Sequence, residues 1–428
     1  MKNIFQYATA LSLVIGSFSS CKPKEVEIEV IKEVKSEKDA PTQYEFESRF
    51  SDGVSSVDYG GQTVRQLLVQ DIKTIISDAT NVVGKKVKVD VIALLNRTDA
   101  DGKSTFTSAG SFTLLKNKYS SIATGKNLYG KMSTASVISY NTTAQDLIEG
   151  WLEAIDARVD AGKIGKAIYI SDDFLDYNQL INKTLTGSVI YSQGTSNYLN
   201  KVLTQDNKVA KGDKPYTAME RTWDEAFGYF GASRNYADYT DAELKSLRYK
   251  DANNDGKIDF RSEYNFSLST NAGKRDLGAA VDPNFSKEAF DLFLSGRTAI
   301  TNQKSIAQIT PYVKNTAIVW EKIIAATVVH YLREITDDLN ESSIDTDNLA
   351  KHFSEGKGFL IALQYGGNYK LINDSDLQSL HNLMGQNPSA GIVDATAISQ
   401  YKSDLAEAKN ILRRIYNFKQ DNIDVWRH

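Results

Sequence analysis

Apolar residues recur at helical spacing through most of the chain after residue 60, and this pattern most limits what the chain can fold into. In QTVRQLLVQDIKTIISDA (62–79), for example, Val64, Leu67, Leu68, Ile72, Ile75 and Ile76 form a single stripe. Comparable patterns occupy 142–159, 174–203, 220–232, 287–300, 312–339, 349–366, 376–385 and 395–418. The sequence therefore predicts a mainly α fold built from packed helical bundles.

Four regions of the sequence depart from a single regular helical pattern. KKVKVDVIALLNR (85–97) combines a β-branched start with a later Leu-Leu pair, so strand and helix both remain open. Residues 98–140 and 232–285 lack a sustained apolar stripe, and we predict long loops there. The segment 174–203 reads as one long helix, with an interruption near Gly194.

The first twenty residues have the features of a secretory signal. Lys2 precedes an apolar run from Ala8 to Phe18, which is too short for a membrane-spanning helix. Small residues then lead into Cys21, the only cysteine of the chain, at the place where a lipoprotein signal is cleaved and acylated. We expect lipidation at Cys21; the alternative is an ordinary signal with an incidental cysteine. No disulfide can form within the chain, so the core must hold the fold.

Residues 21–43 follow as a charged segment. It is rich in Lys and Glu and contains no aromatic residue before Pro41, which is typical of a solvated tether after a lipid anchor. The sequence thus predicts a membrane partner through Cys21 and a cell-envelope location, as an outer-membrane lipoprotein facing the periplasm or the cell surface. Formal net charge is −4, and no cluster of Lys and Arg marks a nucleic-acid-binding surface.

The stretch DANNDGKIDFRSE (251–263) follows the opening of an EF-hand calcium loop. Alternate positions carry oxygen ligands, and a glycine stands where such loops turn sharply. Position twelve is Ser262 instead of Glu, so Glu263 closes the site only if the exit is one residue longer. The expected calcium ligands are Asp251, Asn253, Asp255, Lys257 through its carbonyl, Asp259 and Glu263. The alternative is a solvated Asn-Asp-Gly turn; the fainter TDADGKS (98–104) is interpreted as a turn.

Common enzyme motifs are missing from the sequence. It contains no HExxH, no CxxC and no Gly-x-Ser-x-Gly, and only four histidines. One candidate remains in HYLRE, where His330 and Glu334 are four apart on a helical pattern and so share a face. Such a pair binds a metal or acts as an acid–base pair, or it is a structural hydrogen bond near a helix end. The 22 tyrosines suit either a carbohydrate or haem groove or ordinary helix interfaces.

Five segments together resemble a Bacteroidetes lipoprotein family catalogued as domain-of-unknown-function family 4856. They occur in order from about Tyr44 to the C-terminus: YEFESRFSDGVSSVDYGGQTVRQLL, YNQLINKTLTGSVIYSQGT, WDEAFGYFGASRNY, DANNDGKIDF and RRIYNF. That family is similar in architecture to the imelysin-like proteins, which pack two helical bundles around a cleft. The resemblance implies a link to iron or haem uptake, or metal-dependent peptidase activity. The imelysin Gly-x-His-x-x-Glu signature is absent, and its nearest echo, AFGYFGASR (226–234), lacks both His and Glu.

The resemblance also divides residues 44–428 into three parts. A first bundle is expected over about 60–235, a loop with the calcium-type motif over 236–285, and a second bundle over about 286–420. We expect a non-catalytic, lipid-anchored binding protein, with iron or haem as ligand and a structural calcium ion. The alternatives are an imelysin-like metal-dependent peptidase and an adhesive surface protein.

Overall fold

A computed structural model of the chain describes residues 39–97 and 112–427. With 61% helix and 3% strand, the fold is mainly α, as the apolar spacing predicts. The signal segment 1–20, Cys21 and nearly all of the tether lie outside the described residues, as does the predicted turn at 98–104. No helix in the described part is both long enough and apolar enough to cross a bilayer.

Most helices of the first half lie close to their predicted ranges. The region left open between strand and helix is a helix, α2, whose Val91 and Leu95 are buried. A two-stranded antiparallel ribbon precedes α4. The elements are α1 (Gly60–Asp78), α2 (Lys88–Leu95), α3 (Tyr119–Ile122), β1 (Ser136–Val137), β2 (Thr142–Thr143), α4 (Ala144–Asp160), α5 (Tyr177–Leu185), α6 (Asn200–Val202) and α7 (Ala218–Phe230).

Between α5 and α6 the chain stays helical, but with π-helical turns. These are η5 (Thr186–Tyr191) and η6 (Gln193–Leu199). Gly194, where an interruption was expected, lies inside η6, and a Cβ there would be 2.2 Å from the Trp320 ring. The glycine therefore lets Trp320 pack directly against the helix backbone, and the distortion widens the helix without ending it.

In the second half, two helices interrupt the stretch predicted as a long loop. These are α8 and α9, whose polar sequences lack a wide apolar stripe. The remaining helices follow the predicted patterns. The elements are α8 (Asp241–Ser246), α9 (Ser267–Leu277), α10 (Phe285–Thr301), α11 (Ile306–Asp338), α12 (Thr346–Leu363), α13 (Asp374–Met384), α14 (Ala395–Tyr416) and α15 (Gln420–Val425).

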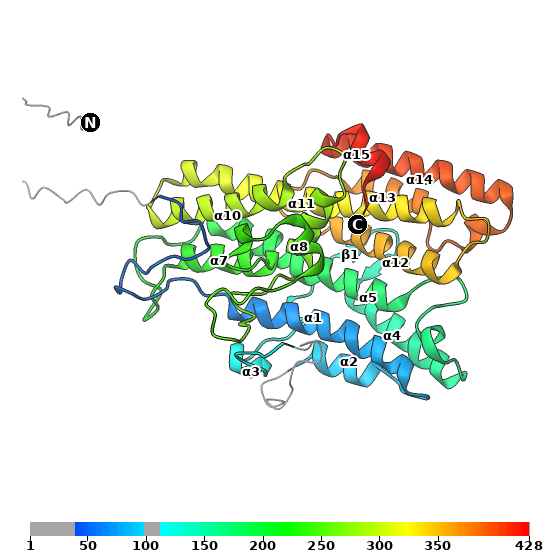
Figure 1. The fold of residues 1–428 in the computed structure, drawn as a ribbon, viewed down its shortest axis with the longest axis horizontal. Coiled ribbons are helices and arrows are strands. Elements are labelled where there is room, and N and C mark those ends of the chain that lie inside the picture. Colours follow the sequence, from blue (N-terminus) through cyan, green and yellow to red (C-terminus); the bar gives the residue numbers. More distant parts are fainter. Residues whose placement is uncertain (1–38, 98–111, 428) are drawn as a thin grey trace, which may run out of the picture. The chain divides into compact units, whose positions relative to one another are not determined.

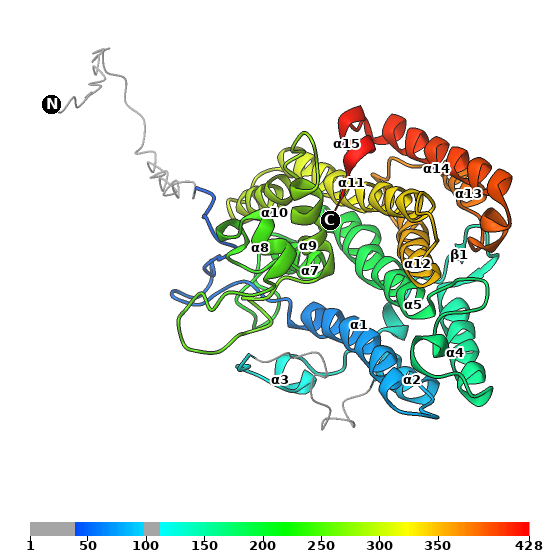
Figure 2. The same cartoon turned by 45° about the vertical axis from the view of Figure 1, so that its right-hand side comes forward.

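Helix α11 is the centre of the core. It packs against α9, α10, α12 and α14, and α12 in turn packs against α5, which lies on α1 (Figures 1 and 2). Its residues from Trp320 to Val329 are almost all buried, because neighbours cover most sides of the helix. Helices from the two predicted bundles are thus in direct contact, and the described residues from 39 onward group as one compact unit.

A buried ion network joins the N-terminal segment to this core. The Arg297 side chain, 0% exposed, lies 3.0 Å from Glu220 and 2.9 Å from Asp224. Arg297 also donates to Ser56 at 2.8 Å, and the Tyr44 hydroxyl donates to Asp224 at 2.8 Å. Because buried charges are tolerated only when paired, this network fixes how the segment before α1 lies on α7 and α10.

Candidate functional site

A basic cavity of about 280 Å³ lies where helices from both halves of the chain meet. Its walls come from α1, α5, α9, α11 and α12, together with the segment after α8. The lining residues are Gln66, Val69, Gln70, Lys73, Thr74, Asn182, Lys183, Arg248, Phe266, Ser267, Thr270, Asn271, Lys274, Tyr331, Glu355 and Phe359.

The charges around the basic cavity do not balance. Four lining residues are cations and one, Glu355, is an anion; Lys183 Nζ lies 3.2 Å from a Glu355 carboxylate oxygen. Within residues 39–97 and 112–427, no hydrogen bond or ion pair engages the side chain of Lys73, Arg248 or Lys274. Four cations around a cavity that contains a single carboxylate repel one another, so the arrangement favours an anion.

The pKa values of the two partly buried lysines are lowered by this repulsion together with burial. Lys183 lowers the pKa of Lys73 to about 7, and burial adds to the effect. Burial lowers the pKa of Lys274 to about 8, helped by Arg248 and Lys183. A bound anion would reverse both effects, because an opposite charge stabilises the protonated amine. Perturbed groups gathered in a cavity are typical of binding and catalytic sites.

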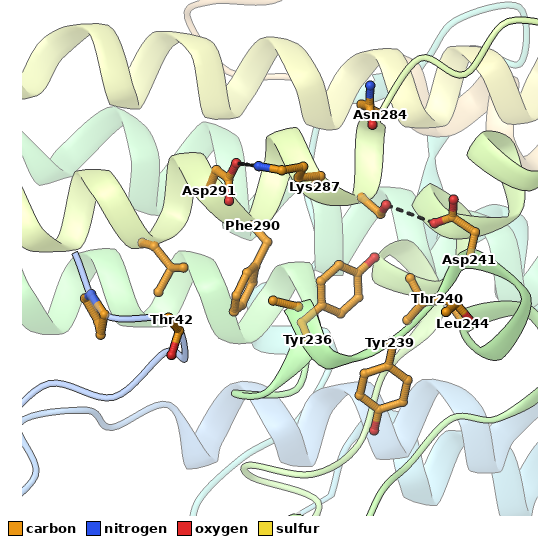
Figure 3. A pocket seen from close by; sticks show the side chains of 14 residues that line it. Thr42, Tyr236, Tyr239, Thr240, Asp241, Leu244, Asn284, Lys287, Phe290 and Asp291 are labelled. Carbon is orange, nitrogen blue, oxygen red and sulfur yellow. Dashed lines mark hydrogen bonds and ion pairs between the residues drawn. The ribbon is translucent and has the colours of Figure 1, made fainter.

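A larger cavity of about 620 Å³ lies between α8 and α10, beside Pro41 and Thr42 (Figure 3). Tyr236, Tyr239 and Phe290 contribute aromatic rings to its lining. Its charged groups already have partners. Lys287 pairs with Asp291, and the Asp241 carboxylate accepts a hydrogen bond from Ser286 at 3.0 Å. The charged side chains of this cavity therefore do not indicate a charged ligand.

The predicted calcium loop forms one turn that gathers its first three ligand residues. The Asp251 carboxylate accepts backbone N–H groups from Asp255 at 3.1 Å and Gly256 at 2.8 Å. The Asn253 side-chain oxygen accepts the Asp255 N–H at 3.0 Å. Asn254 and Gly256 both have positive φ, 58° and 76°, which lets the chain turn sharply at these positions.

The end of the loop returns to its start through Glu263. This buried carboxylate accepts the N–H of Ala252 at 3.0 Å and that of Asp259 at 2.8 Å. The Asp259 carboxylate instead pairs with Arg261 at 2.8 Å. Among the residues the structure describes, no three His, Cys, Asp or Glu side chains come close enough together to hold a metal ion. The calcium site stays a prediction, in which Asp259 would have to leave Arg261.

His330 and Glu334 lie together on α11, as their spacing predicts. His330 Nδ1 is 3.7 Å from a Glu334 oxygen and 3.4 Å from the Trp426 carbonyl. Burial lowers the pKa of His330 to about 2, so the imidazole is neutral at physiological pH. In the described part of the chain no third His, Cys, Asp or Glu joins them in a metal-binding group. The contact with the C-terminal segment agrees with the structural interpretation.

The basic cavity was not foreseen from the sequence. Its cations stand at positions 73, 183, 248 and 274, each within a segment of ordinary composition. No short motif joins them, because three helices, α1, α5 and α9, and the segment after α8 bring them together. A local signal is the adjacent pair Lys274 and Arg275 near the end of α9.

Comparisons with known proteins add a family but no activity. A family model matches residues 41–408, and its description is "Domain of unknown function (DUF4856)". No curated protein and no solved structure matches the chain.

Proposed function

The chain belongs to that uncharacterised family, and we propose that it is a non-catalytic binding protein that holds a small anionic ligand in the basic cavity. The observation that carries this proposal is the set of three cations, Lys73, Arg248 and Lys274, which line one cavity and have no partner in the described part of the chain. Holding such charges together without a counter-ion destabilises the folded protein. Binding of an anion would remove this repulsion, so the arrangement indicates a binding site.

The size of the cavity limits the ligand. Ligand pockets usually measure about 300–1,000 Å³, so about 280 Å³ suits a small molecule. If the ligand is linked to iron uptake, a small anionic iron chelate suits this volume better than the haem macrocycle. The side chains on offer are ammonium, guanidinium, amide and hydroxyl groups, which bind carboxylate or phosphate oxygens.

The remaining parts of the proposal concern where the protein works. We propose that Cys21 is lipidated and that the charged tether carries the helical domain at the outer membrane, on its periplasmic face or at the cell surface. A calcium ion in the loop 251–263 would stabilise the connection between the helices around it. Lipid anchoring would place the basic cavity where small solutes cross the envelope.

The test is isothermal titration of the full chain in detergent with phosphate, citrate, ferric citrate and haem at constant ionic strength. At least one small anion should bind, and Lys73→Gln and Lys274→Gln should each weaken its binding about tenfold. Lys211→Gln, an exposed position away from the cavity, is the matched control and should bind as the wild type does. If no anion binds, the proposal is wrong. Peptide hydrolysis abolished by Glu334→Ala would favour the peptidase alternative.

A further inference from the structure

The N-terminus of α9 borders the basic cavity and has no cap. The helix begins at Ser267, its N-cap residue Phe266 has no side chain that accepts a hydrogen bond, and its first turn contains no acidic residue. In the part of the chain that the structure describes, no acceptor binds the backbone N–H groups of Ser267, Leu268 and Ser269. Leu268 and Ser269 are completely buried. Helix ends buried in this way normally have an acceptor from a side chain, water or ligand.

The unpaired cations lie around the same space as this helix end. Ser267 and Thr270 of the first turn line the cavity, and Lys274 follows one turn later on the same helix. Lys73 of α1 and Arg248 complete the set. Free N–H groups and the positive end of the helix dipole attract an anion in the same direction as the side-chain charges. Two independent features, one of the backbone and one of the side chains, thus point to an anion at this spot.

We propose that the basic cavity binds a phosphate group, either inorganic phosphate or the phosphate of a small monoester, with its oxygens at the N-terminus of α9. This inference rests on the proposed function and names its ligand class. A phosphate monoester carries about two negative charges at neutral pH and three strongly accepting oxygens, which suit three unpaired cations and several donors better than a single carboxylate does. The Ser267 hydroxyl is a further donor at the same end of the helix, whereas the Thr270 hydroxyl donates to the Ser267 carbonyl at 2.9 Å.

The experiment titrates the full chain in detergent with inorganic phosphate, glucose 6-phosphate, glucose and citrate in a chloride buffer of fixed ionic strength. Phosphate or glucose 6-phosphate should bind at least about tenfold more tightly than citrate, and glucose should not bind. Binding of inorganic phosphate alone identifies the free ion as ligand, and tighter binding of the sugar phosphate identifies a monoester. If citrate binds and neither phosphate compound does, the phosphate inference is overturned while the proposed function stands. If none binds, the phosphate inference fails, and the proposed function fails as well if ferric citrate and haem also do not bind.

A substitution at the helix end separates binding from folding. Ser267→Asp places a carboxylate in the first turn of α9, where a negative charge favours the helix. We therefore expect an unfolding temperature equal to or above that of the wild type, but phosphate binding about tenfold weaker or worse, because the carboxylate takes the anion's place. Ser267→Ala, which removes only the hydroxyl, should bind more tightly than Ser267→Asp. Wild-type affinity in Ser267→Asp would overturn the placement at α9.

Discussion

Lys73 lies on α1 in the wall of the basic cavity, where Lys183 and burial lower its pKa to about 7 although the Glu355 and Asp176 carboxylates act in the opposite direction. In the unfolded chain this amine titrates near its ordinary value of about 10.4. The folded state therefore holds fewer protons than the unfolded state between about pH 7 and 10, so stability rises with pH across this window. At pH 7 and below, the charged Lys73 destabilises the ligand-free protein.

The first prediction follows from that sign. Lys73→Met should be more stable than the wild type at pH 6, and its advantage should shrink between pH 7 and pH 10. The same variant should bind anions more weakly, so stability and binding move in opposite directions. Urea unfolding at pH 6 and at pH 10, with Lys211→Met as control, measures the difference in stability. A variant less stable than the wild type at pH 6 would show that Lys73 supports the fold.

His381 gives a second prediction at this scale. It is 1% exposed, neither ring nitrogen has a hydrogen-bond partner in the described residues, and burial lowers its pKa to about 2. The unfolded chain takes up a proton below about pH 6.5 while the folded protein does not, so acidification lowers stability by about 1.4 kcal/mol per pH unit. His381→Leu lacks this contribution, so its free energy of unfolding should fall less than that of the wild type between pH 6 and pH 4.5. Equal slopes in both proteins would contradict it.

Residue-level prediction from the sequence worked where the residues are close in the chain. The spacing of His330 and Glu334 places them on one face of a helix, and the structure has them 3.7 Å apart. The spacing gave no sign that His330 also faces the carbonyl of Trp426, ninety-six positions away. The same limit hid Lys73 and Lys274, because an unpaired charge is recognised only when its whole surroundings are known.

Among the elements, the π-helical segment η6 shows why glycine stands at position 194. An alanine there would force its Cβ against the Trp320 ring, whereas Gly150 in α4 is exposed and has nothing within 4 Å. Gly194→Ala should therefore destabilise the protein by about 1–3 kcal/mol through overpacking. Gly150→Ala should stabilise it by about 0.5–1 kcal/mol through helix propensity. Urea denaturation of both variants checks this pair, and a stabilised Gly194→Ala would refute the packing argument.

The loop 251–263 is an element whose prediction concerns a ligand. Its turn already brings Asp251, Asn253 and Asp255 together, and Glu263 closes back onto its start. Added calcium should raise the unfolding temperature relative to EDTA, and Asp255→Ala should abolish the rise while leaving the EDTA value nearly unchanged. Differential scanning calorimetry measures both. No calcium effect on the wild type would mean that this segment is an ordinary turn.

Helix positions were largely predictable from the sequence, and the exceptions have physical causes. Amphipathic helices such as α1 and α4 were recognised because one stripe faces the core. Helix α9 was not predicted from the sequence, because the helix, SLSTNAGKRDL, buries polar residues, including Ser269 and Arg275. A helix that lines a polar cavity does not need an apolar stripe, so apolar spacing does not reveal α9, the helix whose N-terminus borders the proposed site.

In the whole molecule, the helices of the two predicted bundles share one core. The basic cavity takes walls from α1 and α5 of the first half and from α9, α11 and α12 of the second. The buried Arg297 network further ties the N-terminal segment to α7 and α10. Sequence patterns located most of the helices but not α8 and α9, and they could not show that α5 packs on α12, since such contacts depend on residues far apart in the chain.

This shared core predicts how the protein unfolds. Because the halves bury their surfaces against each other, residues 39–427 should unfold in one cooperative transition, and a phosphate compound bound in the cavity should shift all of it. Binding only to the native state adds about 2.7 kcal/mol at a hundredfold excess over the dissociation constant. Calorimetry with and without ligand tests this. Lys274→Gln, which experiences the same general salt effect, should show little shift. Two transitions, with only one moved by the ligand, would mean that the bundles fold separately and that one of them alone binds the anion.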